Sequence, residues 1–264
     1  MLEIKNVSKT FNPGTVNAKT ALNGLNLTLN DGDFVTVIGG NGAGKSTMLN
    51  AVAGTIQVDT GSIILDGKDL TRMPEFKRAA YLGRVFQDPM MGTAATMQIE
   101  ENLAMADRRG KRRTLRPGIT AADRERYIEQ LKILDLGLEN RMTAKVGLLS
   151  GGQRQALTLL MATLQKPELL LLDEHTAALD PKTASKVLNL TQKLVDEQEL
   201  TAMMVTHNMK DALRYGNRTI MMHEGRIILD IDRETKSHLQ VEDLLMMFEK
   251  ASGSGIVNDR MLLG

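Results

Sequence analysis

The sequence predicts an α/β fold with a mainly parallel sheet, an N-terminal antiparallel β segment and an inserted α-helical segment. β-rich runs at 34–38 and 202–205 are separated by longer helical patterns, an order typical of a parallel sheet. Turn signals are frequent before residue 70, and strand signals fade from about 88 to 166. With 264 residues and 42% hydrophobic content, the chain can form one large domain with a core, alone or with a subdomain.

The N-terminal β segment is predicted from turn signals between short runs that alternate apolar and polar residues. These signals are Asn12-Pro13-Gly14, Asn23-Gly24, Asn30-Asp31-Gly32 and Asp66-Gly67. Such residues favour tight turns, so antiparallel strands and hairpins are expected here.

The later elements follow in order along the chain. Thr120–Asp123 has the pattern of a capping box, which predicts a helix running to about Leu134. The other expected elements are helices at 46–53 and 154–165, a buried strand at 169–172, a short strand at 226–231 and an amphipathic helix at 241–248.

The composition excludes several classes of protein. Lys and Arg number 33 against 32 Asp and Glu, so no overall basic excess favours nucleic acid. Cysteine is absent, which excludes disulfides and thiolate metal sites and fits a reducing compartment such as the cytoplasm. Met1–Lys5 has no secretion-signal pattern, and no apolar run approaches the roughly 20 residues that span a bilayer. At a membrane, another chain would have to anchor this one.

A phosphate-binding loop is predicted between the strand at 34–38 and the helix at 46–53. Its residues, Gly39, Gly40, Asn41, Gly42, Ala43, Gly44, Lys45, Ser46 and Thr47, fit the pattern Gly, four residues, Gly-Lys-Ser/Thr. Glycines let the backbone surround phosphate oxygens, Lys45 can reach the β and γ phosphates, and Ser46 can ligate Mg²⁺. The alternative is a glycine-rich turn before a helix. The motif itself indicates only a P-loop nucleotide-binding core.

Two carboxylates end the apolar run at 169–172. Burying Asp173 and Glu174 inside a core strand would be costly, so both are expected at the strand's mouth. There Asp173 can hold the magnesium shell, and Glu174 can orient and deprotonate the water that attacks the γ phosphate. The alternative is a strand followed by an acidic turn.

Leu149-Ser150-Gly151-Gly152-Gln153 precedes the helix at 154–165, so Ser150 and the two glycine amides are expected at a helix N-terminus able to bind phosphate. A simple helix cap is the alternative. Together with both nucleotide motifs, this segment resembles the signature of the ABC transporter ATPases. The resemblance covers about residues 2–230. It implies one ABC ATPase domain over 1–264, with a nucleotide-binding core at 1–87 and 167–232, a helical subdomain at 88–166, and a C-terminal helix and tail at 233–264.

The resemblance implies further site residues. Phe11 matches the family's adenine-stacking aromatic, and Gln87 matches the glutamine that contacts magnesium and the attacking water. Asp180 matches the loop that crosses between two subunits, and His207 matches the histidine that contacts the γ phosphate. Without the family resemblance, Phe11 would be interpreted as a core residue, Gln87 as a turn residue and His207 as a structural histidine.

The resemblance also implies partners. Ser150 and its glycines would close over ATP held by Lys45 of a second subunit, in a head-to-tail dimer, expected to be a homodimer. Transmembrane permease subunits, an extracytoplasmic substrate-binding protein and a place at the inner face of the cell membrane are expected, and nucleic acid is not. The implied function is ATP hydrolysis driving a bacterial importer of amino acids or related solutes. The alternative is a non-transport ABC ATPase acting in membrane signalling or on nucleic acid or ribosomes.

The chain departs from the common family pattern after the catalytic glutamate. His175 stands where many relatives have proline, and Ala177-Ala178 replaces a pair that usually contains serine. Neither change removes a catalytic group. The run Asp173–Pro181 is most similar to ATPases of importers with a lipoprotein receptor, including tryptophan or tyrosine systems.

Two surface features are open to more than one interpretation. A basic run indicates either a solvated loop or contact with anionic lipid or an acidic partner; it comprises Arg108, Arg109, Lys111, Arg112, Arg113 and Arg116. Most of the 17 methionines suggest adaptable core filling, but Met90 and Met91 follow Gln87, where the family receives a membrane helix. They are either core or a docking surface.

Overall fold

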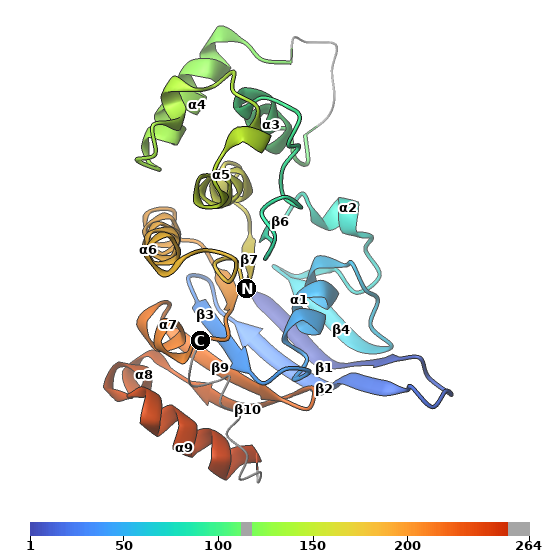
Figure 1. Cartoon of the computed structure of the whole chain (residues 1–264). Coiled ribbons are helices and arrows are strands. Elements are labelled where there is room, and N and C mark those ends of the chain that lie inside the picture. The colour runs from blue at the N-terminus through green and yellow to red at the C-terminus, as the bar shows by residue number, and fades with distance from the viewer. Residues whose placement is uncertain (112–117, 253–264) are drawn as a thin grey trace. The chain divides into compact units, whose positions relative to one another are not determined.

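The structure is a computed structural model that describes residues 1–111 and 118–252 (Figure 1). It divides into two compact units. The first unit comprises Met1–Arg78 and Glu199–Gly264, and the second comprises Ala79–Gln198. Within the described ranges, no helix is both long enough and apolar enough to cross a membrane.

An antiparallel sheet forms part of the first unit, as the sequence predicts. Its strands are β1 (Leu2–Phe11), β2 (Lys19–Leu29), β4 (Thr60–Leu65) and β5 (Lys68–Asp69), in the order β2-β1-β4-β5. Every neighbouring pair is antiparallel. The turn at Asp66-Gly67 joins β4 to β5, as expected for a hairpin.

The predicted turn at Asn23-Gly24 is wrong, because both residues lie inside β2. Lys9 pairs with Leu22 and Val7 with Leu25, so β2 carries one more residue than β1 between these pairs. This is a β-bulge, and Gly24 supplies the positive φ of 61° at that position. The Asn23-Gly24 pair, which is typical of a tight turn, therefore forms a β-bulge within a continuous strand.

A second group of strands in the first unit includes the predicted parallel strands. β3 (Phe34–Gly39) runs parallel to both β8 (Ala202–Val205) and β9 (Arg218–His223), and β10 (Arg226–Ile231) pairs antiparallel with β9. All four residues of β8 are buried, which explains its continuous apolar sequence.

Helices of the first unit follow these strands. They are α1 (Lys45–Ala53), the short α2 (Glu75–Arg78), α7 (Met209–Arg214), α8 (Arg233–His238) and α9 (Val241–Ser252). Leu244 and Phe248 of α9 pack with Met209 of α7 and Ile38 of β3 in one buried cluster. The amphipathic pattern at 241–248 therefore corresponds to a helix that covers the sheet, and the predicted tail beyond 252 lies outside the described residues.

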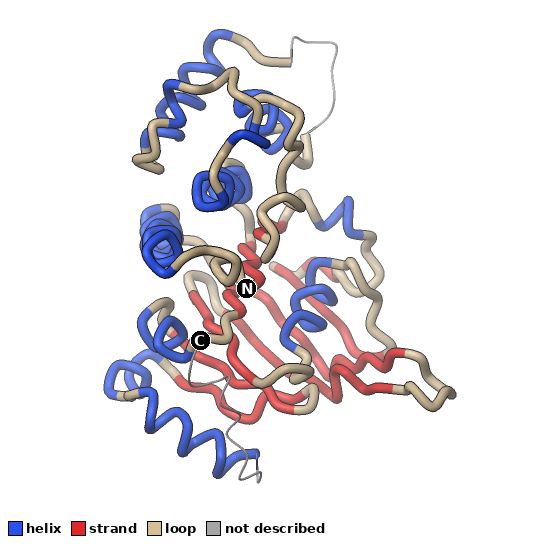
Figure 2. The backbone as a smooth tube through the Cα atoms, viewed as in Figure 1, coloured by secondary structure: helices blue, strands red, loops and turns tan. Residues whose placement is uncertain are grey.

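The second unit is largely helical, as predicted for the middle of the chain (Figure 2). Parallel strands β6 (Leu82–Val85) and β7 (Leu169–Asp173) accompany α3 (Ile99–Asp107), α4 (Ala121–Lys132), α5 (Gly151–Thr163), α6 (Pro181–Glu197) and two short 3₁₀ turns at Leu138–Asn140 and Val146–Leu148. Leu103, Leu131 and Leu157 belong to its buried core. The predicted capping box of α4 is confirmed, since Thr120 and Asp123 make both reciprocal bonds.

The described part of the basic run makes contacts inside the second unit. Arg109 donates to the carbonyl oxygens of Ala162 (3.1 Å) and Gln165 (2.9 Å) at the end of α5. Arg108 donates to the Gly118 carbonyl oxygen at 2.6 Å, and Lys111 pairs with Asp107 at 3.4 Å. Arg109 thus provides hydrogen-bond donors for carbonyl oxygens at the end of α5. This role differs from both predicted interpretations of the basic run, a solvated loop and a contact with anionic lipid or an acidic partner. Arg112, Arg113 and Arg116 lie outside the described residues.

Lys236 of α8 is a buried lysine in the first unit, with only 5% of its surface exposed. Its Nζ donates to the Tyr215 carbonyl oxygen at 2.5 Å and to the Thr36 hydroxyl at 3.5 Å. Tyr215 ends α7 and Thr36 lies in β3, so Lys236 ties α8 to both elements. Burial lowers the pKa of Lys236 to about 8.

This burial predicts a pH-dependent stability. Because the folded-state pKa lies below the ordinary value of 10.5, the folded chain releases the proton first as the pH rises through about 8. Lys236 therefore contributes stability that is present above pH 10.5 and is lost as the pH falls through 8. Relative to Lys236→Met, the wild type should gain about 1–2 kcal/mol in unfolding free energy between pH ~7.5 and ~9.5, measured by denaturant titration. A difference that stays constant over this range would contradict the prediction.

Candidate nucleotide-binding site

The phosphate loop connects β3 to α1 in the first unit. Gly44 is the N-cap of α1 with φ 103°, and no side chain caps the helix start. Lys45 is only 7% exposed, and its Nζ donates to the carbonyl oxygens of Gly39 (2.7 Å) and Gly40 (3.3 Å). The helix N-terminus thus presents amide donors without a side-chain acceptor, beside a lysine folded across the loop. This arrangement fits a phosphate group.

Two loop glycines are required by close backbone approach. Gly39 has φ 149°, and a Cβ atom there would collide with the Met222 carbonyl oxygen. A Cβ atom on Gly44 would collide with the Ala21 carbonyl oxygen. The strands around the loop therefore hold its backbone where no side chain fits. Asn41, Gly42 and Ser46 are exposed, so the Ser46 hydroxyl is accessible to a ligand.

Phe11 and His207 are also accessible in the first unit. Phe11 ends β1 with 36% of its surface exposed, and Nζ of Lys9 lies 5.8 Å from its ring centroid. His207 is exposed between β8 and α7. Burial raises the pKa of Asp211 in α7, while the charges of Arg214 and His207 act in the opposite direction. Phe11 is thus no core residue, in contrast to the interpretation expected without the family.

Asp173 and Glu174 lie at the end of β7 in the second unit. Asp173 Oδ2 lies 4.0 Å from Nη2 of Arg84, and both residues are partly buried. Glu174 has φ 43°, a left-handed conformation that costs a non-glycine residue roughly 1–3 kcal/mol. Its carbonyl oxygen accepts from the Ala177 amide at 3.0 Å. The strand therefore stops abruptly, as the carboxylates predict, at a residue held in a strained conformation.

His175 is an internal contact of the second unit. Its ring is only 2% exposed, and Nε2 lies 3.0 Å from the Thr191 hydroxyl. Because that hydroxyl donates to the Val187 carbonyl oxygen at 2.9 Å, it accepts a hydrogen bond from His175 Nε2–H. Burial lowers the pKa of His175 to about 4, so the ring is neutral at pH 7. The departure from the family pattern thus anchors the end of β7 to α6.

Ser150 is the N-cap of α5, as expected. Its Oγ accepts from the Gln153 amide at 3.3 Å, and Gln153 Oε1 accepts from the Ser150 amide at 3.2 Å. Asp180 caps α6 and accepts from the Thr183 amide at 3.1 Å, and hydrogen bonds from the Thr183 side chain and backbone lower the pKa of Asp180. A Cβ atom on Gly152 would collide with the Thr183 methyl group. Thr183 therefore brings the segments of Gly152 and Asp180 together.

Gln87 is exposed two residues after β6 ends. Met90 and Met91, which follow it, are 45% and 70% exposed, and the guanidinium of Arg154 contacts the Met90 sulfur. Met203, Met204, Met221 and Met222 are all buried, as core filling predicts. Met90 and Met91 are therefore exposed, unlike these four methionines, as a docking surface requires.

The predicted site residues are distributed between the two units. The phosphate loop, Phe11 and His207 belong to the first, and Gln87, Ser150, Asp173, Glu174 and Asp180 belong to the second. Sequence reasoning missed Arg84, which approaches Asp173, and Lys19, whose ammonium lies beside Gly42. Neither residue stands in a motif, so no pattern marked them.

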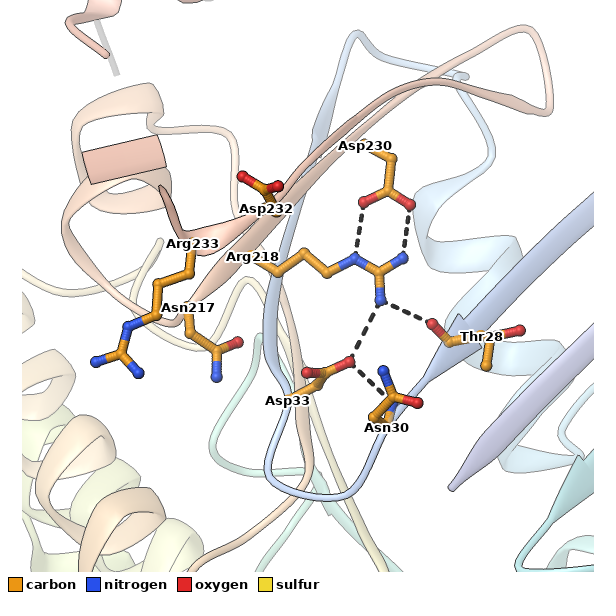
Figure 3. A pocket seen from close by; sticks show the side chains of 8 residues that line it. All are labelled: Thr28, Asn30, Asp33, Asn217, Arg218, Asp230, Asp232 and Arg233. Carbon is orange, nitrogen blue, oxygen red and sulfur yellow. Dashed lines mark hydrogen bonds and ion pairs between the residues drawn. The ribbon is translucent and has the colours of Figure 1, made fainter. Parts of the chain in front are cut away.

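A polar cavity of about 690 Å³ lies in the first unit, and none of its lining residues belongs to the phosphate loop. Figure 3 shows the side chains that line it. Arg218 occupies its wall and donates to Asp230 (2.7 and 2.6 Å), to the Thr28 carbonyl oxygen (2.7 Å) and to Asp33 (3.3 Å). Asp33 precedes the start of β3, whereas the phosphate loop follows the strand's other end. The ion pairs of Arg218 with Asp230 and Asp33 therefore form part of the cavity wall.

The loop between β3 and α1 defines a P-loop nucleotide-binding protein. The sequence model of the family described as ABC transporter matches residues 22–177. The chain is also 45% identical to the tyrosine transport ATP-binding protein of Clostridioides difficile (strain R20291), over 95% of this chain and 100% of that protein. The chain therefore belongs to the ABC transporter family, as an ATP-binding subunit with ATPase activity.

Other relatives agree with this assignment. A spermidine/putrescine import ATP-binding protein of Haemophilus influenzae (strain KW20) is 34% identical over 87% of this chain, but only 57% of its own length is matched. Among solved structures, the chain resembles a dimeric post-hydrolysis state of the ATP-binding cassette MJ0796 bound to ADP and Pi. The TM-score is 0.75 at 32% identity, with 88% of this chain and 99% of that chain covered.

Proposed function

We propose that this chain hydrolyses ATP to drive a bacterial importer of an aromatic amino acid or a related small solute. The observation that carries this proposal is the 45% identity to a tyrosine transport ATP-binding protein across that protein's whole length. Other relatives are named for methionine import and for spermidine or putrescine import, so small nitrogen-containing solutes recur among them.

In this proposal the site residues have the following roles. Lys45 and the loop amides bind the β and γ phosphates, and Phe11 stacks on adenine. Glu174 orients and deprotonates the attacking water, and His207 contacts the γ phosphate. Gln87 contacts the water and links hydrolysis to movement of the helical part. The accessibility of Phe11, Ser46 and His207 supports these roles.

The residues present fit a magnesium ion bound together with ATP. Mg²⁺ prefers oxygen ligands and usually takes one or two carboxylates besides substrate phosphates. The exposed hydroxyl of Ser46, the carboxylate of Asp173 and the side-chain oxygen of Gln87 are such ligands. When bound, Mg²⁺ supplies positive charge to the phosphates. Oxygens of the ATP phosphates would complete the shell.

We further propose a head-to-tail dimer in which Ser150, Gly151, Gly152 and Gln153 of one subunit close over ATP on the other's phosphate loop. The similarity to the cassette MJ0796, whose solved structures are dimeric, supports a dimer. The backbone amides of Gly151 and Gly152 at the start of α5, which take no part in the capping box of Ser150 and Gln153, suit a phosphate. Transmembrane permease subunits and an extracytoplasmic substrate-binding protein complete the transporter, which places this subunit on the inner face of the membrane.

Transport can be tested by reconstitution. The subunit is purified together with its transmembrane permease and placed in liposomes, with ATP on the side of the subunit and the substrate-binding protein on the other side, and uptake of labelled tyrosine and tryptophan is measured. Uptake of one of them should depend on ATP and be lost with Lys45→Ala. Vigorous ATP hydrolysis without uptake of any amino acid by the complete complex would contradict the importer assignment.

A further inference from the structure

Lys19 at the start of β2 lies directly beside the phosphate loop. A Cβ atom built on Gly42 would lie 3.1 Å from Nζ of Lys19 and 4.0 Å from its Cε. Lys19 is also the partner of Phe11 in the antiparallel pair of β1 and β2. The fold therefore brings an ammonium group from another strand to the loop, next to the aromatic proposed to hold adenine.

The ammonium group of Lys19 has no hydrogen bond or ion pair with any residue in 1–111 or 118–252. The neighbouring lysines of β1 behave differently, because Lys5 pairs with Glu3 and Lys9 pairs with Asp59. Near Gly42, the positive end of the α1 dipole and Lys45 both oppose a second cation. A bound anion would turn this unfavourable position into a favourable one.

We propose that Lys19 is a further phosphate-binding residue, whose ammonium contacts the phosphate oxygens of the nucleotide on the loop. The proposal rests on the proposed function, since it requires ATP at this loop. Lys45 donates to the carbonyl oxygens of Gly39 and Gly40, whereas Lys19 approaches Gly42 from β2, so the two lysines lie beside different residues of the loop. Ammonium–phosphate hydrogen bonds carry charge on both partners and are stronger than neutral ones.

The test measures dissociation constants of ATP and ADP by calorimetry, on the full chain and without added magnesium to prevent turnover. For Lys19→Ala both constants should rise about tenfold at low salt, the loss of one charged hydrogen bond. Lys19→Arg should bind ATP nearly as well as the wild type. At high salt the difference in dissociation constant between Lys19→Ala and the wild type should become smaller, because exposed charges are screened.

Two results would overturn the proposal. One is unchanged affinity in Lys19→Ala. The other is a loss that Lys19→Arg shares and that salt does not reduce, which would indicate packing of the side chain. Lys5→Ala is the matched control, an exposed lysine on the paired strand, and should bind ATP normally. If Lys45→Ala also binds ATP normally, the proposed function itself fails; if only Lys45→Ala loses affinity, the role of Lys19 alone fails.

Discussion

Glu174→Gln is expected to reduce ATP turnover by about 10²–10⁴-fold, the usual contribution of a general base. Glutamine keeps the size and hydrogen-bonding shape of the side chain but cannot accept the proton of the attacking water. ATP binding should persist, because the phosphate loop is unchanged. The variant should therefore accumulate as an ATP-bound dimer, seen by size-exclusion chromatography with light scattering, while phosphate release measures turnover.

The matched control is Glu197→Gln at the exposed end of α6 in the same unit, where the carboxylate lies 3.9 Å from the ammonium group of Lys193. It should hydrolyse ATP at the wild-type rate. The strained φ of Glu174 makes folding a necessary second measurement, so the thermal midpoint of each variant is compared. Wild-type turnover in a folded Glu174→Gln variant would refute the assignment of Glu174 as the base.

Two heterodimers that each carry one Lys45→Ala and one Ser150→Arg substitution are expected to differ in ATP turnover. They differ only in whether the two substitutions lie on different subunits or on the same subunit. Alone, each variant should lose about 10²-fold or more in turnover, since each removes charge stabilisation or blocks the start of α5. With one substitution on each subunit, a head-to-tail dimer keeps one intact site and should retain activity. With both on one subunit and none on the other, each shared site is damaged and activity should be lost.

The two heterodimers are prepared with different affinity tags on the two subunits, purified in tandem, and assayed for phosphate release. The design is self-controlled, because composition and mutations are identical and only their distribution differs. Activity would instead survive in the dimer with one unmodified subunit if each site were formed within a single chain. That result, or equal activity of both dimers, would rule out the shared site.

Part of the fold could be predicted because it depends on neighbouring residues. The capping box of Thr120 and Asp123 and the N-cap at Ser150 are local hydrogen bonds between residues three apart. The glycines around Lys45 specify a loop that few other sequences form. The apolar run of β7 predicted a buried strand for the same reason, since its burial follows from composition.

Other features depend on partners far away in the sequence. Asn23-Gly24 has the composition of a turn, but pairing with β1 made it a bulge in a long strand. The role of Arg109 was predicted from its basic neighbours. In the structure its side chain instead donates to carbonyl oxygens of residues more than 50 positions later in the sequence. No local pattern encodes such contacts, because they arise only when the core has packed.

The sequence by itself determined the class of chemistry: a P-loop with Lys45, a strand ending in Asp173 and Glu174, and a cap at Ser150, all specified by short motifs. Only the tertiary structure decided which side chains surround them. It placed Lys19 beside Gly42 and brought the His175 ring into hydrogen-bonding contact with Thr191. The physical reason is that motif chemistry depends on the covalent order of a few residues, whereas charge and burial around a site depend on segments that the fold brings together.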